Sequence, residues 1–221
     1  MLPEVSGLSG LDVGCGEGTN TRKVAELGAK MSAIDIAEGF IEYARETEKE
    51  SPLGVEYRVA DARELPFRDG TFDFATAFMS MMDVMDPGKV LREVRRVVRP
   101  GGFFQFSILH PCFAPPHRKV LRHPDGKAYA IEIADYYVAG RHHEQWYFSQ
   151  TTDDEKKTVK PFQVPYIHLT LTMWVELLDS VGFRLKRFGE PKADAEAIRK
   201  CPELQDTDVA GIFLHVLAYR T

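Results

Sequence analysis

Apolar runs that fit β-strands alternate with amphipathic runs that fit α-helices through the first half of the chain. Alternating or fully apolar segments predict strands, and apolar residues three and four positions apart predict helices. Strands are predicted at residues 8–13, 30–36, 55–59, 71–78 and 103–109, and helices at 19–27, 38–50 and from Pro87 onward. This alternation with short connections predicts an α/β fold, with a parallel sheet between two layers of helices.

The alternation stops after Leu109 and resumes only near residue 167. Residues 110 to about 166 are rich in proline, aromatic residues and histidine and show no clear helical period. A long segment of this kind is usually a functional lid or an insertion with a small structure of its own. After it, a helix is predicted over 167–181, a strand over 182–188, a polar connection over 191–208 and a final strand over 211–218. We therefore expect a single domain over residues 1–221, with a lid-like insertion after the fifth strand at about 110–166.

Composition and charge exclude several classes of function. Of the 221 residues, 44% are hydrophobic and 28% are charged, and the formal net charge is −5. No overall positive field would therefore attract nucleic acid or an anionic membrane. No run of about 18 apolar residues is present, so we expect no membrane span. The first residues also lack the basic and apolar pattern of a secretory signal, and we predict a cytoplasmic protein.

The three cysteines, Cys15, Cys112 and Cys201, are far apart in the sequence. Neither a CxxC pair nor a set of histidines and carboxylates at metal-ligand spacing is present. The sequence therefore predicts no disulfide framework and no metal site. Cys112 as a nucleophile is weighed against Cys112 as a small buried apolar residue, which is the commoner case.

A glycine-rich turn with the sequence LDVGCGEG, at residues 11–18, directly follows the first predicted strand. Glycine has no Cβ and tolerates positive φ, so such a turn lets backbone N–H groups approach a ligand at the start of the next helix. Three ligand classes use turns of this kind: nucleotide phosphates, dinucleotides such as NAD, and S-adenosylmethionine (SAM). A P-loop is excluded because no Gly-Lys-Ser/Thr follows.

The turn by itself does not separate NAD from SAM. Asp35 ends the second predicted strand, where an acid that binds ribose hydroxyls is expected. The glycine spacing is GxGxG instead of GxGxxG, and the carboxylate of Asp12 would repel a pyrophosphate but not a cationic sulfonium. Two structural alternatives stay open: Asp35 as a cap of the following helix, and Asp61, after the third strand, as part of an Asx turn.

Three further segments give the turn its context: VADARELPF at 59–67, DGTFD at 69–73 and RPGG at 99–102. In this order, and over about residues 8–110, they resemble the class I SAM-dependent methyltransferases. The resemblance is to the small-molecule branch related to the ubiquinone and menaquinone biosynthesis methyltransferases. It implies a Rossmann-like three-layer sandwich, with a seven-stranded, mostly parallel sheet whose last strand is antiparallel.

The resemblance also implies a site for SAM and its product S-adenosylhomocysteine (SAH). The positions that match the motif around the methionine part of SAM are Asp12, Gly14, Cys15 and Gly16. Asp35 matches the acid that binds both ribose hydroxyls, and Ile36 is expected on the adenine face. Asp61 matches the acid that accepts from the adenine amino group, with the Ala62 backbone beside the ring. Met79 matches the position whose backbone contacts the ammonium end, and its alternative role is flexible packing.

The activity implied is methyl transfer from SAM to a small-molecule acceptor by in-line displacement. Such an enzyme mainly aligns the reacting atoms and excludes water, and it needs a general base only if the acceptor must lose a proton early. His110, at the end of the fifth strand, and His168, at the start of the predicted helix, are the candidate bases. The alternatives are a strand-end histidine bonded to backbone and an exposed residue at a helix start.

The aromatic residues of the insertion predict an apolar or aromatic acceptor, because ligand pockets are mostly lined by such side chains. The residues expected to form a pocket wall or lid are His142 and His143 with Trp146, Tyr147 and Phe148. The alternative for them is ordinary packing of an insertion that needs its own small core.

Two other functions stay open: a non-catalytic module that binds SAM or SAH, and an NAD-linked oxidoreductase. The first is kept because only residues 1–7 precede the first strand, where members of the family carry one or two covering helices. The insertion, a neighbouring subunit of a homo-oligomer or a truncated start would each account for this difference.

Overall fold

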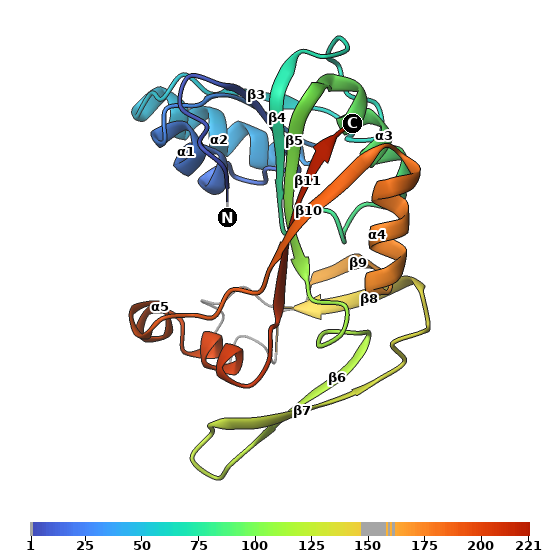
Figure 1. Ribbon diagram of the computed structural model, residues 1–221. Coiled ribbons are helices and arrows are strands. Elements are labelled where there is room, and N and C mark those ends of the chain that lie inside the picture. Colours follow the sequence, from blue (N-terminus) through green and yellow to red (C-terminus); the bar gives the residue numbers. More distant parts are fainter. Residues whose placement is uncertain (1, 147–157, 159, 161) are drawn as a thin grey trace.

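The central element of the structure is a seven-stranded sheet with helices on both faces (Figure 1). The computed structural model describes residues 2–146, 158, 160 and 162–221. The strand order is β10-β11-β5-β4-β1-β2-β3. The strands span Ser9–Val13 (β1), Lys30–Asp35 (β2), Glu56–Val59 (β3), Phe72–Phe78 (β4), Val98–Leu109 (β5), Phe183–Gly189 (β10) and Phe213–Arg220 (β11).

Strand directions confirm the predicted fold class. β1 pairs in parallel with both β2 and β4, and β3 and β5 extend the sheet in parallel on either side. The last strand, β11, is antiparallel to its two neighbours, β5 and β10. The order of the chain reverses between β1 and β4, which is where ligands bind in open sheets of this kind.

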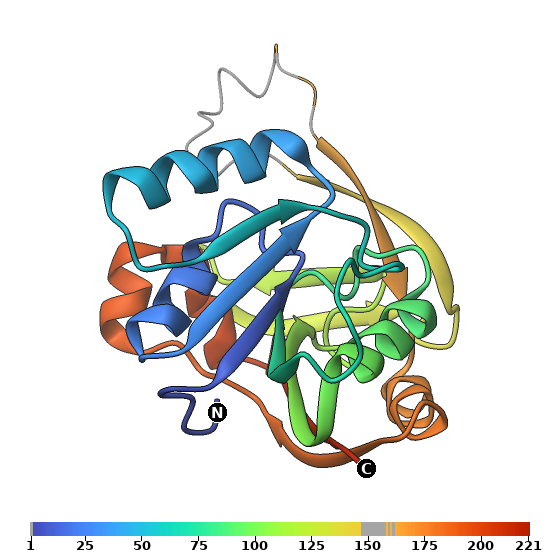
Figure 2. The same cartoon turned by 90° about the horizontal axis from the view of Figure 1, so that it is seen from above.

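The helices form two layers, as Figure 1 and the view from above in Figure 2 show. α1 (Thr19–Glu26) and α2 (Glu38–Glu50) cover one face of the sheet. α3 (Pro87–Val97) and α4 (Leu171–Ser180) cover the other face. In the described part of the chain, we find no helix with the length and apolar content needed to cross a membrane.

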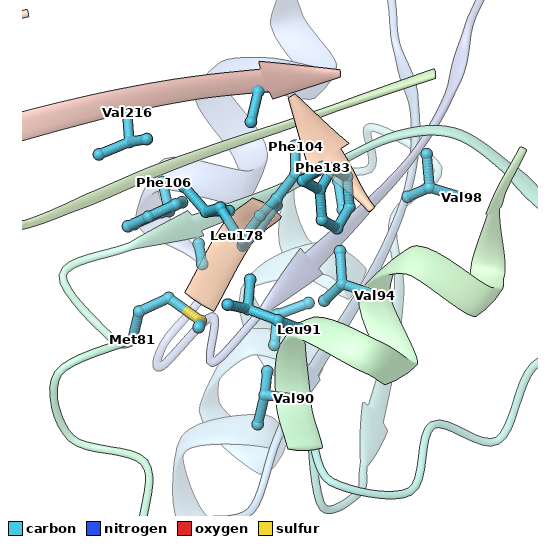
Figure 3. Close-up of a cluster of buried hydrophobic side chains, with 14 of the residues drawn as sticks. Met81, Val90, Leu91, Val94, Val98, Phe104, Phe106, Leu178, Phe183 and Val216 are labelled. Carbon is cyan, nitrogen blue, oxygen red and sulfur yellow. The ribbon is translucent and has the colours of Figure 1, made fainter. Parts of the chain in front are cut away.

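Each face of the sheet has its own buried cluster. On the α3 and α4 side, Phe104 and Phe106 of β5 lie against Phe183 and Trp174, with ring centroids 5.9 and 5.6 Å apart (Figure 3). Val90, Leu91 and Val94 of α3, spaced three and four positions apart, face the same cluster. On the other side, the cluster joins α1 and α2 to the sheet through Val24, Ile41, Ala44, Phe74 and Phe103.

The segment between β5 and α4 contains two antiparallel hairpins, where the sequence showed no regular pattern. The first pairs β6 (His117–Arg122) with β7 (Ala128–Ala134) and projects from the sheet in Figure 1. The second pairs β8 (Gly140–Trp146) with β9 (Phe162–His168). A helix beginning at residue 167 was therefore the wrong prediction, because Ile167 and His168 end β9. α4 begins after Thr170, whose hydroxyl caps it by accepting from the N–H of Met173.

Two other segments differ from their predicted form. The polar connection at 191–208 contains α5 (Ala195–Lys200), capped by Asp194, and a 3-10 helix at Pro202–Asp208. The segment Arg-Pro-Gly-Gly at 99–102, whose proline and glycines predict a turn, lies inside β5. β5 pairs with β4 on both sides of this segment, with a shift in register. The turn thus does not separate α3 from β5, since the strand already begins at Val98.

Gly10 provides a test of how tightly the sheet packs. A Cβ at Gly10 would lie 2.3 Å from Cζ of Phe74 and 2.7 Å from Sδ of Met31. Both neighbours are buried, and the Phe74 ring stacks on Phe103 at 5.0 Å, so relief requires movement inside the core. We expect Gly10→Ala to lower the free energy of unfolding by about 1–3 kcal/mol, the usual cost of overpacking. Urea denaturation measures this change.

Gly39 is the matched control for that substitution. It lies exposed in α2, and a Cβ there meets nothing within 4 Å. Gly39→Ala should leave stability unchanged or raise it by up to about 1 kcal/mol through helix propensity. Equal denaturation midpoints for the two variants would contradict the packing argument.

Candidate functional site

A cavity of about 710 Å³ opens at the carboxyl ends of β1 to β4, where the strand order reverses. Eight of the nine predicted SAM-binding residues line it: Gly14, Cys15, Gly16, Asp35, Ile36, Asp61, Ala62 and Met79. They come from the ends of four strands that are adjacent only in the folded sheet. The exception is Asp12, which is buried beneath the glycine turn.

The glycine turn adopts the backbone conformation for which glycine is suited. Gly14, Gly16 and Gly18 have φ values of 70°, 55° and 84°, in the left-handed region that other residues rarely adopt. A Cβ on Gly14 would lie 2.6 Å from Cβ of Ser80, so the turn also allows close approach to the loop after β4. Thr19 and Asn20, in the first turn of α1, complete this side of the cavity and place a helix N-terminus there.

Asp35 links the second strand to the glycine turn. Its Oδ2 accepts from the N–H of Gly16 at 2.8 Å, and its Oδ1 accepts from the N–H of Ala37 at 2.9 Å. The residue that caps α2 is Ala37, without a side-chain bond, so the helix-cap alternative for Asp35 is wrong. The two backbone bonds hold this carboxylate at the cavity wall next to Ile36.

Asp61 lies on the next strand end and forms a fork-shaped ion pair with Arg63. Nη2 and Nε of Arg63 lie 2.6 and 3.0 Å from Oδ2 of Asp61, and the N–H of Arg63 donates to Oδ1 at 2.8 Å. The Asx-turn alternative is therefore also observed, in a residue that lines the cavity. The hydrogen bond from Arg63 lowers the pKa of Asp61 below its usual range. This carboxylate is thus ionised and acts as an acceptor.

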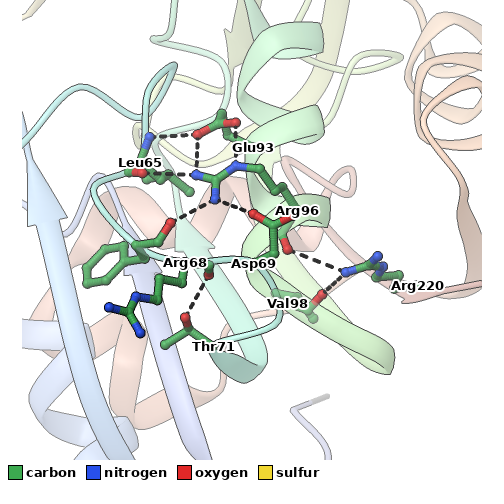
Figure 4. Close-up of polar contacts among 9 residues, drawn as sticks. Leu65, Arg68, Asp69, Thr71, Glu93, Arg96, Val98 and Arg220 are labelled. Atoms are coloured by element: carbon green, nitrogen blue, oxygen red, sulfur yellow. Dashed lines mark hydrogen bonds and ion pairs between the residues drawn. The ribbon is translucent and has the colours of Figure 1, made fainter.

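The loop that carries Asp61 is anchored to α3 (Figure 4). Glu93 accepts from the N–H of Leu65 at 2.8 Å, and Arg96 donates to the carbonyls of Leu65 and Phe67 at 3.0 and 2.7 Å. Arg96 also pairs with Glu93 and with Asp69. This network gives a structural reason for the Leu-Pro-Phe segment, since it fixes the chain that follows the third strand.

Asp12 is buried and has a structural role, and it does not line the cavity. It is 1% exposed, and its carboxylate accepts from the hydroxyls of Thr21 at 2.5 Å and Thr76 at 2.8 Å. Burial raises the pKa of Asp12 to about 6, against the opposing effect of the two threonine hydroxyls. Asp12 therefore joins β1, α1 and β4 under the turn and does not border the space for a ligand.

The chain turns sharply after β4, at the edge of the cavity. Met79 is a non-glycine residue with positive φ, 56°, and its N–H donates to the carbonyl and hydroxyl oxygens of Ser107 at 3.0 and 3.1 Å. The next residue, Ser80, donates to the carbonyl of Val13 at 2.7 Å. A left-handed methionine is strained, and these bonds to β5 and β1 hold it in place.

His110 is buried at the end of β5 and has partners on both ring nitrogens. Nδ1 accepts from the N–H of Cys112, so the proton of the neutral ring is on Nε2, which donates to Glu190 at 3.1 Å. Burial lowers its pKa, opposed by Glu190. His110 does not line the cavity, and its contacts match the alternative of a strand-end histidine bonded to backbone.

His168 also lies outside the cavity lining and is buried at the end of β9. Its Nε2 donates to the carbonyl of Tyr136 at 2.8 Å, while Nδ1 has no hydrogen-bond partner among the described residues. Burial lowers its pKa. The alternative for His168, an exposed residue at a helix start, is therefore wrong.

Two residues of the predicted pocket wall, His142 and His143, lie outside the lining of the large cavity. His142 and His143 line a second, smaller cavity of about 220 Å³. Tyr147 and Phe148, and the side chain of Trp146, lie outside the described residues. Within the parts of the chain that are described, no group of three or more His, Cys, Asp or Glu side chains could hold a metal ion.

Several cavity residues were not predicted. Arg63 follows the predicted pair Asp61 and Ala62 directly, so its place in the motif is the signal that could have found it. Glu17 and Asn20 flank the glycine turn in the same way. Pro165, from β9, reaches the cavity only through the fold of the insertion, and no sequence signal points to it.

Comparison with known proteins agrees with this geometry. Residues 11–106 match the methyltransferase domain family. A solved SAM-dependent methyltransferase from Mesorhizobium loti superposes with a TM-score of 0.78 at 29% identity, covering 100% of this chain and 94% of that chain. Residues 11–106 thus match a methyltransferase domain, and the whole chain has the fold of a solved SAM-dependent methyltransferase.

Two proteins with similar sequences are named for different acceptor atoms. Over 145 residues the chain is 33% identical to a ubiquinone biosynthesis O-methyltransferase of Xanthomonas oryzae pv. oryzae, covering 63% of this chain and 56% of that protein. Over 98 residues it is 38% identical to a sterol 4-C-methyltransferase of Caenorhabditis elegans, covering 42% of this chain and 29% of that protein. The chain thus spans little more than half the length of the first relative and less of the second.

The buried carboxyl of Asp12 should make stability depend on pH. Its pKa is raised from 3.8 to about 6, so the folded protein binds this proton more tightly than the unfolded chain does. The resulting stabilisation is full below the usual carboxyl pKa and is lost as the pH rises through about 6. We expect Asp12→Asn to remove a dependence of roughly 2.5 kcal/mol between pH 4 and pH 7.

Urea denaturation at several pH values tests this expectation. The difference in unfolding free energy between the native protein and Asp12→Asn should fall as the pH rises. Asp125→Asn, in the exposed turn between β6 and β7, is the control and should give curves parallel to those of the native protein. Parallel curves for Asp12→Asn as well would rule out the buried carboxyl as the cause.

Proposed function

We propose that this protein transfers a methyl group from SAM to a small-molecule acceptor. The observation that carries the proposal is the cavity, which gathers the glycine turn, Asp35 and Asp61 at one edge of the sheet. SAM, when bound, supplies a methyl group on a positively charged sulfonium, which is activated for in-line displacement.

The residues of the cavity suit SAM in shape and charge. Gly16 has open space where a Cβ would be, and the turn opens toward the N-terminus of α1, which favours the carboxylate of a ligand. Asp35 is at the position for the ribose hydroxyls, and Ile36, 69% exposed, offers an apolar face for a nucleobase. Asp61 is at the position for an exocyclic amino group, which a carboxylate can accept from.

The electrostatics of the lining favour a cationic donor. Four carboxylates line the cavity: Glu17, Asp35, Asp61 and Asp83. In the described lining they face one basic side chain, Arg63, which is paired with Asp61. A sulfonium and an ammonium group would therefore enter a field of the opposite sign. A dinucleotide pyrophosphate would meet repulsion, which argues against the NAD-linked alternative.

The chain's own contribution to the reaction is alignment and exclusion of water. Phe40, Phe78, Val84, Met85 and Pro165 supply an apolar lining beside the polar positions. His110 and His168 stay predictions as general bases, and their buried contacts favour structural roles. The proposal therefore does not depend on proton transfer through either histidine.

The apolar lining supports an acceptor with an apolar or aromatic body. The two relatives named above are called O- and C-methyltransferases, so similarity alone does not select the acceptor atom. We further propose that residues 1–221 form a single domain whose segment at about 110–166 covers the acceptor side, since Pro165 already borders the cavity. The cytoplasmic location, the absence of nucleic-acid partners and a homo-oligomeric state stay predictions from the sequence.

Ligand-dependent stability tests the proposed donor. SAH at about 100 times its Kd should stabilise the fold by about 2.7 kcal/mol, measured as a rise in Tm. Transfer of label from methyl-labelled SAM to a metabolite pool then separates an enzyme from a non-catalytic binding module. A Tm that responds to NAD and not to SAH would overturn the proposal.

Asp35→Ala should weaken SAH binding roughly tenfold or more, because a hydrogen bond to a charged group contributes about 1.5–3 kcal/mol. Isothermal titration calorimetry measures the affinity. Asp125→Ala is a matched control, since Asp125 accepts from the N–H two residues later at 3.0 Å, as Asp35 does, but lies in the turn between β6 and β7. An Asp35→Ala protein that binds SAH like the control would contradict the ribose assignment.

A further inference from the structure

Arg63 is the feature of the cavity that the proposed function leaves unexplained. It lines the same space as Asp61 and Ala62, and its side chain is 43% exposed. Among the described lining residues it is the one Lys, Arg or His side chain. A cation at the edge of a cavity meant for a cationic ligand requires a reason of its own.

The contacts of Arg63 all go to one partner. Its Nε lies 3.0 Å from both carboxylate oxygens of Asp61, its Nη2 lies 2.6 Å from Oδ2, and its backbone N–H donates to Oδ1. A planar guanidinium that binds a carboxylate through two nitrogens fixes both the position and the rotation of the carboxylate. Asp61 is thereby held in one orientation while part of its acceptor capacity stays available.

The surroundings keep this pair in place. The N–H of Glu64 donates to the carbonyl of Asp61 at 3.0 Å, and Leu65 is bound by Glu93 of α3. Lys89 adds a weaker attraction to Asp61, and Asp86 faces Arg63. The pair is therefore set on a rigid turn, and its charges are balanced by neighbours from α3 and its cap.

We infer that Arg63 is a positioning residue for nucleobase recognition. It orients the Asp61 carboxylate as a pure acceptor toward an exocyclic amino group at the cavity wall. This inference rests on the proposed function, because the amino group belongs to the adenine of SAM or SAH. A base with a carbonyl in place of the amino group, such as hypoxanthine, would place an acceptor against this acceptor and be rejected.

Three variants with SAH as the probe test the inference. Arg63→Ala should weaken SAH binding about fivefold to tenfold, the effect of one lost positioning interaction. Arg63→Lys should restore part of the affinity, since it keeps the charge but loses the fork. Arg58→Ala is the matched control: Arg58 pairs with Glu56 at the same two-residue spacing, on β3 and outside the cavity lining, and its loss should leave SAH affinity unchanged.

Two readouts separate positioning from a merely structural role. As the pH is lowered, SAH binding is lost when the Asp61 carboxylate becomes protonated. In Arg63→Ala this loss should occur at a higher pH than in the native protein, because the Asp61 carboxyl no longer has the group that lowers its pKa. S-inosylhomocysteine is the analogue of SAH that carries hypoxanthine in place of adenine. The ratio of the affinities for SAH and for S-inosylhomocysteine should be smaller in Arg63→Ala than in the native protein. Unchanged affinity and pH limit in Arg63→Ala, or tighter binding by it, would overturn the inference. Failure of the native protein to bind SAH would instead overturn the proposed function and, with it, this inference.

Discussion

A buried carboxyl group, Asp12, joins the parts of the fold on which the cavity depends. It lies at the end of the first strand and accepts hydrogen bonds from Thr21 of α1 and Thr76 of β4. Removing a carboxylate from water is costly unless it is hydrogen-bonded, and two hydroxyls from different elements provide this compensation. The glycine turn follows directly, so the direction in which it leaves the sheet is set by this contact.

The ligand side of the fold is then built from bonds between strand ends. Asp35 holds the turn through Gly16, Ser80 holds β1 through Val13, and the loop after β3 is tied to α3 through Glu93 and Arg96. Asp35, Ser80 and the loop that carries Asp61 are thus each bonded to an element other than their own. A cavity wall supported in this way is preorganised, which lowers the entropic cost of binding a ligand.

The histidines show how far burial changes the meaning of a residue type. His110 and His168 are candidate bases when only their predicted places, at a strand end and at a helix start, are known. In the structure both are buried with lowered pKa values, and neither lines the cavity. The acidic lining carries more information about the ligand, because its sign opposes a pyrophosphate and favours a sulfonium.

The sequence by itself determined the strand and helix alternation, the glycine turn and eight of the nine cavity residues predicted from motifs. These are local signals: periodicity, positive φ at glycines and acids at strand ends each depend on a few neighbouring residues. The tertiary structure alone decided the two hairpins after β5, the start of α4 and the burial of Asp12. It also decided that Pro165 lines the cavity and that Arg63 forms an ion pair with the Asp61 carboxylate. β8 and β9 pair residues that are far apart in the chain, such as Gly140 with His168, and burial depends on what covers a side chain, so neither can be read from a short segment.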